Sequence, residues 1–508
     1  MLQYVMNRVA LAMLLFQRLL AVASPDYGLP NSVVGTARVL SNVDEASTYL
    51  ETLAASQLVS ASISQTVYGL PTIVEILQET GTTVSEDGTN IANALSTLTE
   101  SSSGDPTALF DAVLSSIQDA LGRMAELLPT TKSSLSAIIG SNVPDRLTDS
   151  FGRIDTGLRI LQTQIETLKS AILAAVAEAG SATSISSAIL GKHITAQKVY
   201  NVARTVKNLR AFLPVVRYTL NTSIEDAVEA DNYLTAYNSA LESLEGMVTN
   251  IMESLNAAKQ SFYDTVESGV QELAASYLYA NEDTLSLPIS EDPDLGAEIT
   301  AMLSKFTTTL GDPENDLLSV ATQLQNYLNA INSMVSINDP EVVSISDSEL
   351  IKALIQTLIY SGPYSRYCFH KYKDLVSYLS NYLLNESIIC IDREIPRLAN
   401  LATAVQSILD VNAFDFEDIY DYLTICNELQ AATDRTDCVA RIGQSYTPLG
   451  DYFADKYDLL FDLTTSEVNA SKQRVKICIN LSRRSISDGY ISDLQDDIEQ
   501  CATKGPNE

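Results

Sequence analysis

The sequence predicts an all-α protein built of long antiparallel helices in coiled-coil-like bundles, with a disulfide-stapled helical domain at its C-terminal end. Apolar residues recur at alternating steps of three and four, the spacing of helices that pack at shallow angles. No stretch of comparable length alternates apolar and polar residues with period two, as a strand would. Prolines preceded by aspartates mark helix starts along the chain.

The first element, residues 1–23, has the form of a secretory signal peptide. Arg8 precedes the apolar run VALAMLLF, and a small-x-small cleavage site ends at Ala23. Gln17 and Arg18 interrupt the apolar stretch, which therefore falls short of the about 20 uninterrupted residues of a membrane span. We expect a secreted, extracellular protein with no membrane span.

Residues 24–340 form a cysteine-free, Ser/Thr/Ala-rich body for which we predict a bundle of helices. Unbroken heptad seams run from Leu147 to Ala175 and from Leu234 to Phe262, and shorter ones from Phe110 to Leu127 and from Leu317 to Met334. These seams could be satisfied inside one monomer or could pair with a second chain, so the sequence leaves a homo-oligomer open.

Helix boundaries are predicted from capping residues. Asp105, Asp312 and Asp339 each precede a proline and are expected to be N-caps, and Ser223 and Asp415 have the sequence context of further caps. The acidic stretches 85–90 and 290–296 are expected to be connections between helices.

An internal repeat is one interpretation of two similar segments. The segments that begin GDPTALF at Gly104 and GDPENDL at Gly311 are offset by 207 residues, and their seams superimpose. The same offset places the seam from Leu161 to Ala175 on the seam from Cys368 to Tyr382. An ancient duplication would explain both matches, although any two heptad helices can be slid into register.

Charge excludes two classes of partner. Without residues 1–23 the chain has 30 basic and 64 acidic residues, a net charge of −34. Such a chain repels phosphate backbones and anionic lipids, so we expect no nucleic-acid partner. Disorder is excluded as well, because 46% apolar content is typical of globular proteins.

The sequence contains no convincing catalytic, cofactor or metal site. Its two histidines, His193 and His370, lie 177 residues apart, and we expect both to be solvent-facing helix residues. No close Cys or His spacing suits zinc. The phosphate-loop-like Gly191-Lys192 lacks the required earlier glycine, and the calcium-loop-like run from Asp410 to Asp415 has Phe414 at its fifth position, where an oxygen ligand is needed. We predict that the protein is not an enzyme and that it needs no cofactor.

Six cysteines, all between residues 368 and 501, predict a disulfide framework. If the segment from Cys368 to Cys390 is one helix, its ends are about 33 Å apart and cannot be joined to each other. Cys426 and Cys438 are the natural pair across a helical hairpin. The other four could then pair in a nested order, Cys368 with Cys501 and Cys390 with Cys478, which suits antiparallel helices, or in the alternative order.

Four sequons are candidates for N-glycosylation if they face solvent: Asn221, Asn385, Asn469 and Asn480.

The C-terminal third contains the runs YSRYCFHKY, CIDREIPRL, FEDIYDYLTICNEL and DCVARIGQSY and the closing cysteines, Cys478 and Cys501. In these features residues 345–505 resemble the tsetse EP-like domain of secreted insect proteins. The Glu-Pro repeat that gave the family its name is absent from this chain. The resemblance implies an extracellular helical domain in an insect, in gut, haemolymph or another secretion, and supplies no catalytic or ligand-binding residue.

Three functions are compatible with these observations. The first is a non-enzymatic secreted helical protein that acts through surface recognition or as a structural component, at a gut or immune interface, with an unknown protein or glycan partner. The second is an extracellular carrier of a lipid or small ligand. The third is an enzyme that uses carboxylates which the sequence does not identify.

Overall fold

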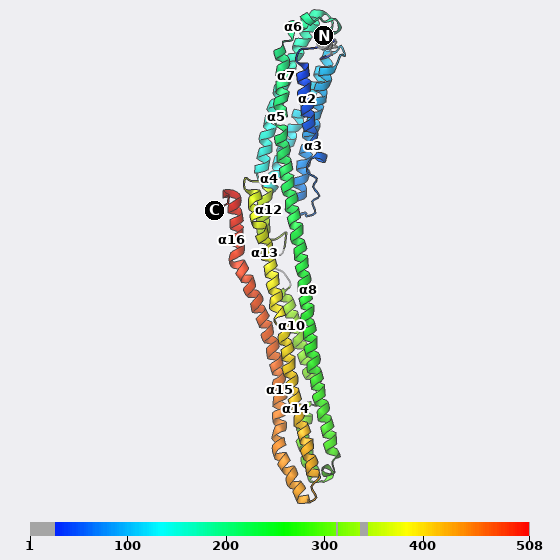
Figure 1. Cartoon of the computed structure of the whole chain (residues 1–508), viewed down its shortest axis with the longest axis vertical. Coiled ribbons are helices and arrows are strands. Elements are labelled where there is room, and N and C mark those ends of the chain that lie inside the picture. The colour runs from blue at the N-terminus through cyan, green and yellow to red at the C-terminus, as the bar shows by residue number, and fades with distance from the viewer. Residues whose placement is uncertain (1–25, 311–312, 336–343, 507–508) are drawn as a thin grey trace, which may run out of the picture. The chain divides into compact units, whose positions relative to one another are not determined.

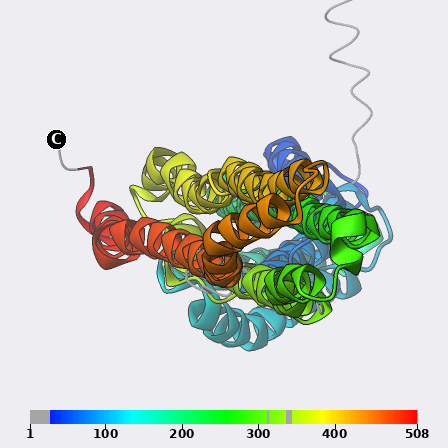
Figure 2. The same cartoon turned by 90° about the horizontal axis from the view of Figure 1, so that it is seen from below.

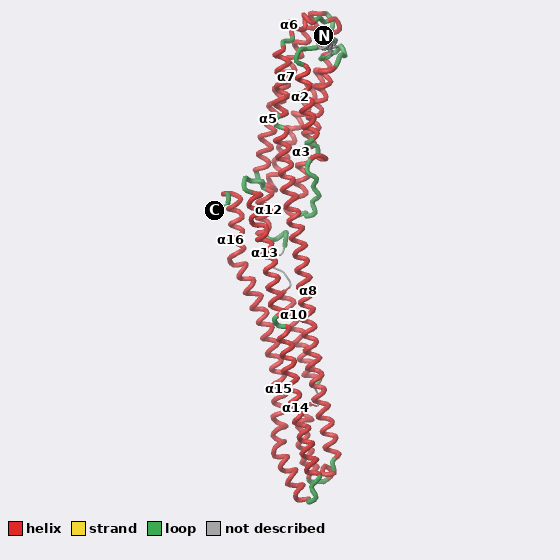
Figure 3. The backbone as a smooth tube through the Cα atoms, in the orientation of Figure 1, coloured by secondary structure: helices red, strands yellow, loops and turns green. Residues whose placement is uncertain are grey.

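The computed structural model describes residues 26–310, 313–335 and 344–506. Within these ranges the chain is helical and forms no strand, apart from a single bridge between Asp26 and Leu29 (Figures 1 and 3). The all-α fold of long packed helices is therefore confirmed. In the end-on view of Figure 2 the helices of a unit run close to the line of sight. The predicted signal peptide, residues 1–23, and the predicted caps Asp312 and Asp339 lie outside the described residues.

The chain divides into two compact units that alternate along the sequence. Unit 1 takes the residues up to Ala236, Ile345–Asp374 and the residues from Gln495 on, and unit 2 takes Tyr237–Ser344 and Leu375–Leu494. The predicted division into a body, 24–340, and a C-terminal domain, 345–505, does not coincide with these units. The sequence cannot show this, because a helix such as α8 (Leu213–Ser286) continues through a unit boundary without any break in its heptad pattern.

Unit 1 is built around a ring of five helices in which each packs against two neighbours, in the order α2, α3, α4, α5, α7 and back to α2. The predicted seams form its interior, with Phe110 of α4 and Phe151 of α5 fully buried. The ring helices are α2 (Thr36–Glu51), α3 (Leu70–Glu100), α4 (Pro106–Ile139), α5 (Asn142–Ala179) and α7 (Ala196–Arg210), with the short α6 (Ser187–His193) between the last two.

Five helices leave more space on the axis of a bundle than four. At an interaxial spacing of about 10 Å, the axis of a four-helix square lies about 7 Å from each helix, and that of a five-helix ring about 8.5 Å. Side chains of ordinary size fill the first arrangement more completely than the second. The ring of unit 1 is therefore the place in this fold where an internal cavity is expected.

The rest of unit 1 comes from distant parts of the sequence. It consists of the first part of α8, α12 (Glu349–Ile359), the first part of α13 (Ser365–Asp392) and most of α16 (Ser492–Lys504). The disulfide between Cys368 and Cys501 joins α13 to α16.

Unit 2 is a bundle of four helical columns. The first column is the second part of α8, and the second contains α9 (Leu295–Leu310) and α10 (Glu314–Val335). The third contains the second part of α13 and α14 (Ile395–Asn427), and the fourth is α15 (Ala432–Ser485), which packs against α9, α10 and α14. Successive columns are antiparallel. Short connections join the first column to the second and the third to the fourth, whereas the chain between the second and third columns passes through α12 and the start of α13 in unit 1.

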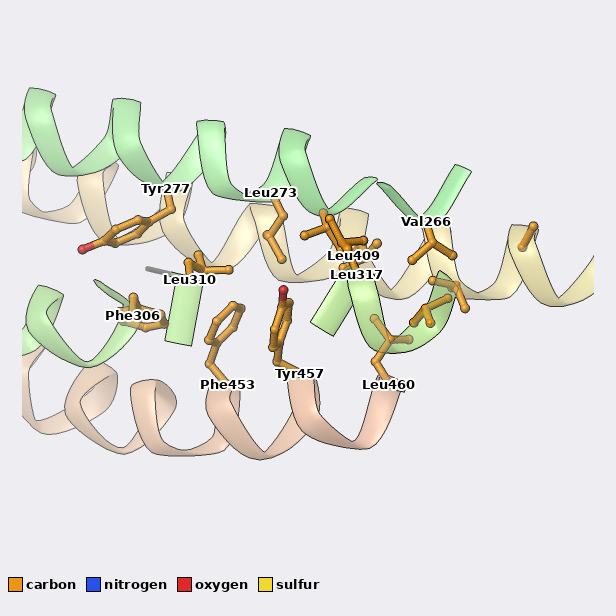
Figure 4. Close-up of a cluster of buried hydrophobic side chains, with 14 of the residues drawn as sticks. Val266, Leu273, Tyr277, Phe306, Leu310, Leu317, Leu409, Phe453, Tyr457 and Leu460 are labelled. Carbon is orange, nitrogen blue, oxygen red and sulfur yellow. The ribbon is translucent and has the colours of Figure 1, made fainter. Parts of the chain in front are cut away.

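One aromatic ring from each column meets in the core of unit 2, and Figure 4 shows three of these rings, those of Tyr277, Phe306 and Phe453. Phe306 of α9 lies 5.0 Å from Phe416 of α14 and 5.3 Å from Phe453 of α15, measured between ring centroids. Tyr277 of α8 lies 5.3 Å from Phe416, and its hydroxyl donates to the Leu303 carbonyl at 3.0 Å. Each of these aromatic pairs contributes about 0.5–1.5 kcal/mol beyond the area it buries, so this layer holds the four columns in register.

Two predicted caps and one predicted loop are wrong. Asp105 does cap α4, where its carboxylate accepts from the Ala108 amide at 3.1 Å. Ser223 lies inside α8, where its hydroxyl donates to the Thr219 carbonyl one turn earlier, and Asp415 lies inside α14. Residues 85–90 are part of α3, whereas 290–296 do contain the connection before α9. Serine and aspartate are compatible with a helix interior when they bond the preceding turn or reach solvent, and tertiary packing decides the boundary.

Candidate functional site

The two histidines lie on the surface of unit 1, and each pairs with a carboxylate. His193 Nε2 is 2.5 Å from Glu178, which also accepts from Lys192 Nζ at 2.8 Å. The bond from Lys192 is the main cause that holds the pKa of Glu178 below its usual value, and the contact with His193 acts in the same direction. His370 Nε2 is 3.2 Å from Glu229. Both contacts lie at the surface of the unit.

The motif candidates that the sequence rejected lie inside helices. Gly191 and Lys192 belong to α6, and the run from Asp410 to Asp415 belongs to α14. A helical backbone cannot wrap its oxygens around one ion, because successive side chains point in different directions. Across the described ranges, no group of three His, Cys, Asp or Glu side chains is placed to hold a metal ion.

The six cysteines form three disulfides, all in the C-terminal third of the sequence. They join Cys368 to Cys501, Cys390 to Cys478 and Cys426 to Cys438, with Cα–Cα distances of 5.6–5.9 Å. This is the nested order that antiparallel helices favoured, and α13 is the single helix that excludes a bond between Cys368 and Cys390.

The four sequons differ in their exposure. Asn385 on α13 and Asn469 and Asn480 on α15 have exposed side chains. Asn221 on α8 is half-buried, and its side-chain oxygen accepts from the Val59 amide at 3.3 Å. The first three could carry a glycan without a change in packing, whereas Asn221 could not.

A buried carboxylate anchors the second segment of unit 1. Asp226 of α8 accepts from the Ser361 hydroxyl and from Arg366 Nε, both at 2.6 Å. Arg366 also donates to Glu225 at 2.9 Å. Burial raises the pKa of Asp226 even though Ser361 and Arg366 act in the opposite direction. The cluster fixes the start of α13 against α8, which is a structural role.

A second buried carboxylate, Glu394, crosslinks unit 2. It accepts from Arg474 Nη2 at 2.9 Å and from the Ser471 hydroxyl at 2.8 Å, and it pairs with Arg397. The Tyr327 hydroxyl lies 2.9 Å from Ser471. Burial acts to raise the pKa of Glu394, but the bonds from Arg474 and Ser471 outweigh it and lower the pKa. An anion already neutralised in this way is a poor base, so the network is structural.

An apolar cavity of about 100 Å³ lies in the five-helix ring of unit 1. Aliphatic side chains and Phe151 form nearly all of its wall, and the polar groups at its edge include Asp87 and Arg210. Asp87 pairs with Arg123, and Arg210 with Glu45. The charges are thus satisfied among themselves, which leaves a space suited to an apolar molecule.

Unit 2 exposes two apolar stripes that the sequence analysis did not detect. The α15 stripe is Tyr452, Leu459, Leu463, Ile477 and Leu481, and the α14 stripe is Ile408, Val411, Phe414, Tyr422 and Ile425. Together they are called the outer face below. The signal was present in the sequence, because the steps of seven, four, fourteen and four in the α15 stripe are whole numbers of turns. It was hidden because the adjacent core residues have the same period.

The comparisons add no relative: no family model, no curated protein and no solved structure matches this chain. The resemblance to the tsetse EP-like domain, like the internal duplication, stays a prediction. Among the described residues, no helix is long and apolar enough to cross a membrane.

Proposed function

We propose that this is a secreted, non-enzymatic helical protein that acts through surface recognition or as a structural component, at a gut or immune interface of an insect. The outer face of unit 2 carries the proposal. It places ten large apolar side chains in solvent on two neighbouring helices of a chain with a net charge of −32. Contiguous exposed apolar surface on a soluble protein is typical of an interaction site.

An extracellular location is supported by the chemistry of the cysteines. The described residues contain no free thiol, and a set of three disulfides persists only in an oxidising compartment. Exposed Asn385, Asn469 and Asn480 are the glycan sites that we propose. Expression in secreting insect cells, followed by peptide mapping, is expected to find the chain in the medium, begun after Ala23, with glycans absent from Asn221.

The recognition surface can be tested with a matched pair of substitutions. Leu459 is 64% exposed in the α15 stripe and Leu318 of α10 is 65% exposed outside both stripes. Each is replaced by Glu, and the folded proteins are used for proximity labelling in the fluid around the secreting tissue. We expect Leu459→Glu to lose the labelled partners of the natural protein and Leu318→Glu to keep them. Equal labelling by both variants would reject the outer face as the recognition surface.

The carrier hypothesis is favoured by one observation, the cavity of unit 1. Its volume of about 100 Å³ is slightly smaller than the about 150 Å³ of engineered apolar cavities that take up benzene or xenon, and too small for a long acyl chain. The ligand class is therefore a small apolar molecule. Benzene is expected to raise the melting temperature of the natural protein and to have no effect on Ala120→Leu, which fills the cavity. An equal shift in both proteins would exclude this site.

A further inference from the structure

The α15 stripe lies beside the core face of its helix and not opposite to it. Tyr452, Leu459 and Leu463 are each followed directly by a buried residue, namely Phe453, Leu460 and Thr464. One residue corresponds to about 100° of rotation, so the stripe is turned by that angle from the direction of the core. Small movements inside unit 2 cannot bury it.

The α14 stripe is displaced in the same sense, since Leu409, Leu423 and Cys426 directly follow its members Ile408, Tyr422 and Ile425. On both helices the stripe residues directly precede core residues. Because the two helices are antiparallel, the stripe is rotated clockwise from the core direction on one helix and anticlockwise on the other when both are viewed from the same end.

The disulfides show that the stripes turn toward each other. On α14, Cys426 directly follows the stripe residue Ile425 and is bonded to Cys438 of α15. On α15, Cys478 directly follows the stripe residue Ile477 and is bonded to Cys390 of α13, which belongs to the same column as α14. In each helix the residue next to the stripe therefore points to the neighbouring column. The Tyr422 ring also lies 6.2 Å from the ring of Tyr446 on α15. The outer face is thus one continuous surface along the junction of the two helices, on the side away from the core.

Charge along α15 is divided into two halves. From Asp451 to Glu467 the helix has five acidic residues and one lysine, whereas from Val468 to Ser485 it has five basic residues and no acid. Arg474 already pairs with Glu394, Arg483 donates to the Met334 carbonyl, and Lys472 lies on the core side of the helix, so Lys476 and Arg484 are the basic side chains placed to meet a partner. A partner that lies along this helix must therefore be basic at one end and acidic at the other.

A second copy of α15 in antiparallel orientation meets that requirement. We propose that the outer face binds the outer face of a second copy of this chain, with α15 antiparallel to α15 about a two-fold axis near Ser466 and Glu467. Tyr452 of each copy then faces Leu481 of the other, and each acidic half lies along a basic half. In a parallel pair acids would face acids, so the charges select the antiparallel orientation. The proposal deepens the proposed function, on which it rests, by naming the partner.

The size of the outer face is sufficient for a stable dimer. Tyr452 and Leu481 are 29 residues apart, which corresponds to about 43 Å of helix. Tyr422 and Ile425 lie level with Tyr446 and Cys438, beyond the Tyr452 end of the α15 stripe. The other eight side chains, which each expose roughly half of an area on the order of 200 Å², offer about 800 Å² per copy. A standard-size interface buries roughly 800 Å² per partner. A two-fold axis also doubles every contact, because the same patch is used on both copies.

The test is sedimentation equilibrium of the purified, disulfide-bonded chain made without glycans, since Asn469 and Asn480 adjoin the stripe. We expect the natural protein and Leu318→Glu to be dimers and Leu459→Glu to be a folded monomer, with far-UV circular dichroism as the control for folding. A monomeric natural protein, or a dimeric Leu459→Glu, would overturn the proposal.

Charge reversal tests the antiparallel orientation. Asp455→Lys with Asp462→Lys changes the net charge of the acidic half of α15 from −4 to 0, and Lys476→Glu with Arg484→Glu changes that of the basic half from +5 to +1, so each double variant loses the attraction between unlike halves. Each double variant is expected to be a monomer alone, and a mixture of the two is expected to form a heterodimer. Double variants that dimerise as well as the natural protein would overturn the orientation.

A failure of the dimer can be distinguished from a failure of the recognition surface. If the natural protein is a monomer but proximity labelling still depends on Leu459, the outer face recognises a different molecule and only the second copy is excluded. If neither measurement depends on Leu459, both proposals are wrong.

Discussion

The nested disulfides predict a stability loss that depends on which bond is removed first. Cys368 and Cys501 are separated by 133 residues, but the bond between Cys390 and Cys478 already closes 88 of them. The unfolded chain therefore has only 45 residues left in the loop that the outer bond closes. By the chain-entropy relation, a loop of 45 residues corresponds to about 4 kcal/mol and one of 133 to about 5 kcal/mol.

Replacing Cys368 and Cys501 by Ala is expected to lower the free energy of unfolding by about 4 kcal/mol with the inner bond present and by about 5 kcal/mol without it. Both cysteines belong to unit 1, so the loss should fall on that unit. Urea unfolding followed by circular dichroism measures it, and hydrogen exchange in α12 and α16 assigns it to unit 1. A loss below about 1 kcal/mol, or one that is larger with the inner bond present, would refute the loop argument.

Two further predictions concern a buried charge and a close helix contact. Glu394→Gln is expected to destabilise unit 2 by about 2 kcal/mol, which is less than the loss on breaking a fully buried ion pair, because Arg474 is partly solvated. The control Glu417→Gln, at an exposed position, is expected to change stability by at most about 0.5 kcal/mol. The pKa of Glu394 is lowered in the folded state, so the stabilisation by its carboxylate is present above about pH 4.3 and is lost as the pH falls further. If the free energies of unfolding of the natural protein and Glu394→Gln, measured with urea, keep a constant difference below that pH, this expectation is wrong. In α3, a Cβ on Gly81 would lie 2.6 Å from a backbone oxygen, whereas one on Gly122 of α4 would meet no atom within 4 Å. Gly81→Ala should cost about 1–3 kcal/mol and Gly122→Ala should add up to about 1 kcal/mol, and thermal melts with the opposite order would refute the close approach.

The helices themselves could be predicted because their signals are local. The seam from Leu147 to Ala175 became the interior of α5 without a change in register, since seven-residue repetition requires no knowledge of the partner helix. Asp105 was found as a cap because a proline follows it, which restricts the backbone at that point. Ser223 and Asp415 lack that restriction, and their helices continue through them.

The arrangement of the helices could not be predicted, because it depends on pairings between residues far apart in sequence. Nothing local in α2 and α7 indicates that they complete a ring, and the cavity of unit 1 follows only from that ring. Asp226 and Glu394 were missed for the same reason: each has an ordinary helical context, and only the fold brings Ser361 or Arg474 to it. The α15 stripe was indistinguishable from a core seam until the core was assigned to the adjacent residues.

The alternation of the two units along the sequence imposes an order of assembly on a chain that is synthesised from its N-terminus. Unit 2 has its last residue available at Leu494, whereas unit 1, which begins first, still lacks α16. Cys501, the partner of Cys368, follows it by 133 residues, so Cys368 must remain reduced or pair wrongly while those residues are added. The surface of α12 and α13 stays exposed during that interval, and disulfide formation, more than helix formation, sets the rate at which the finished molecule appears.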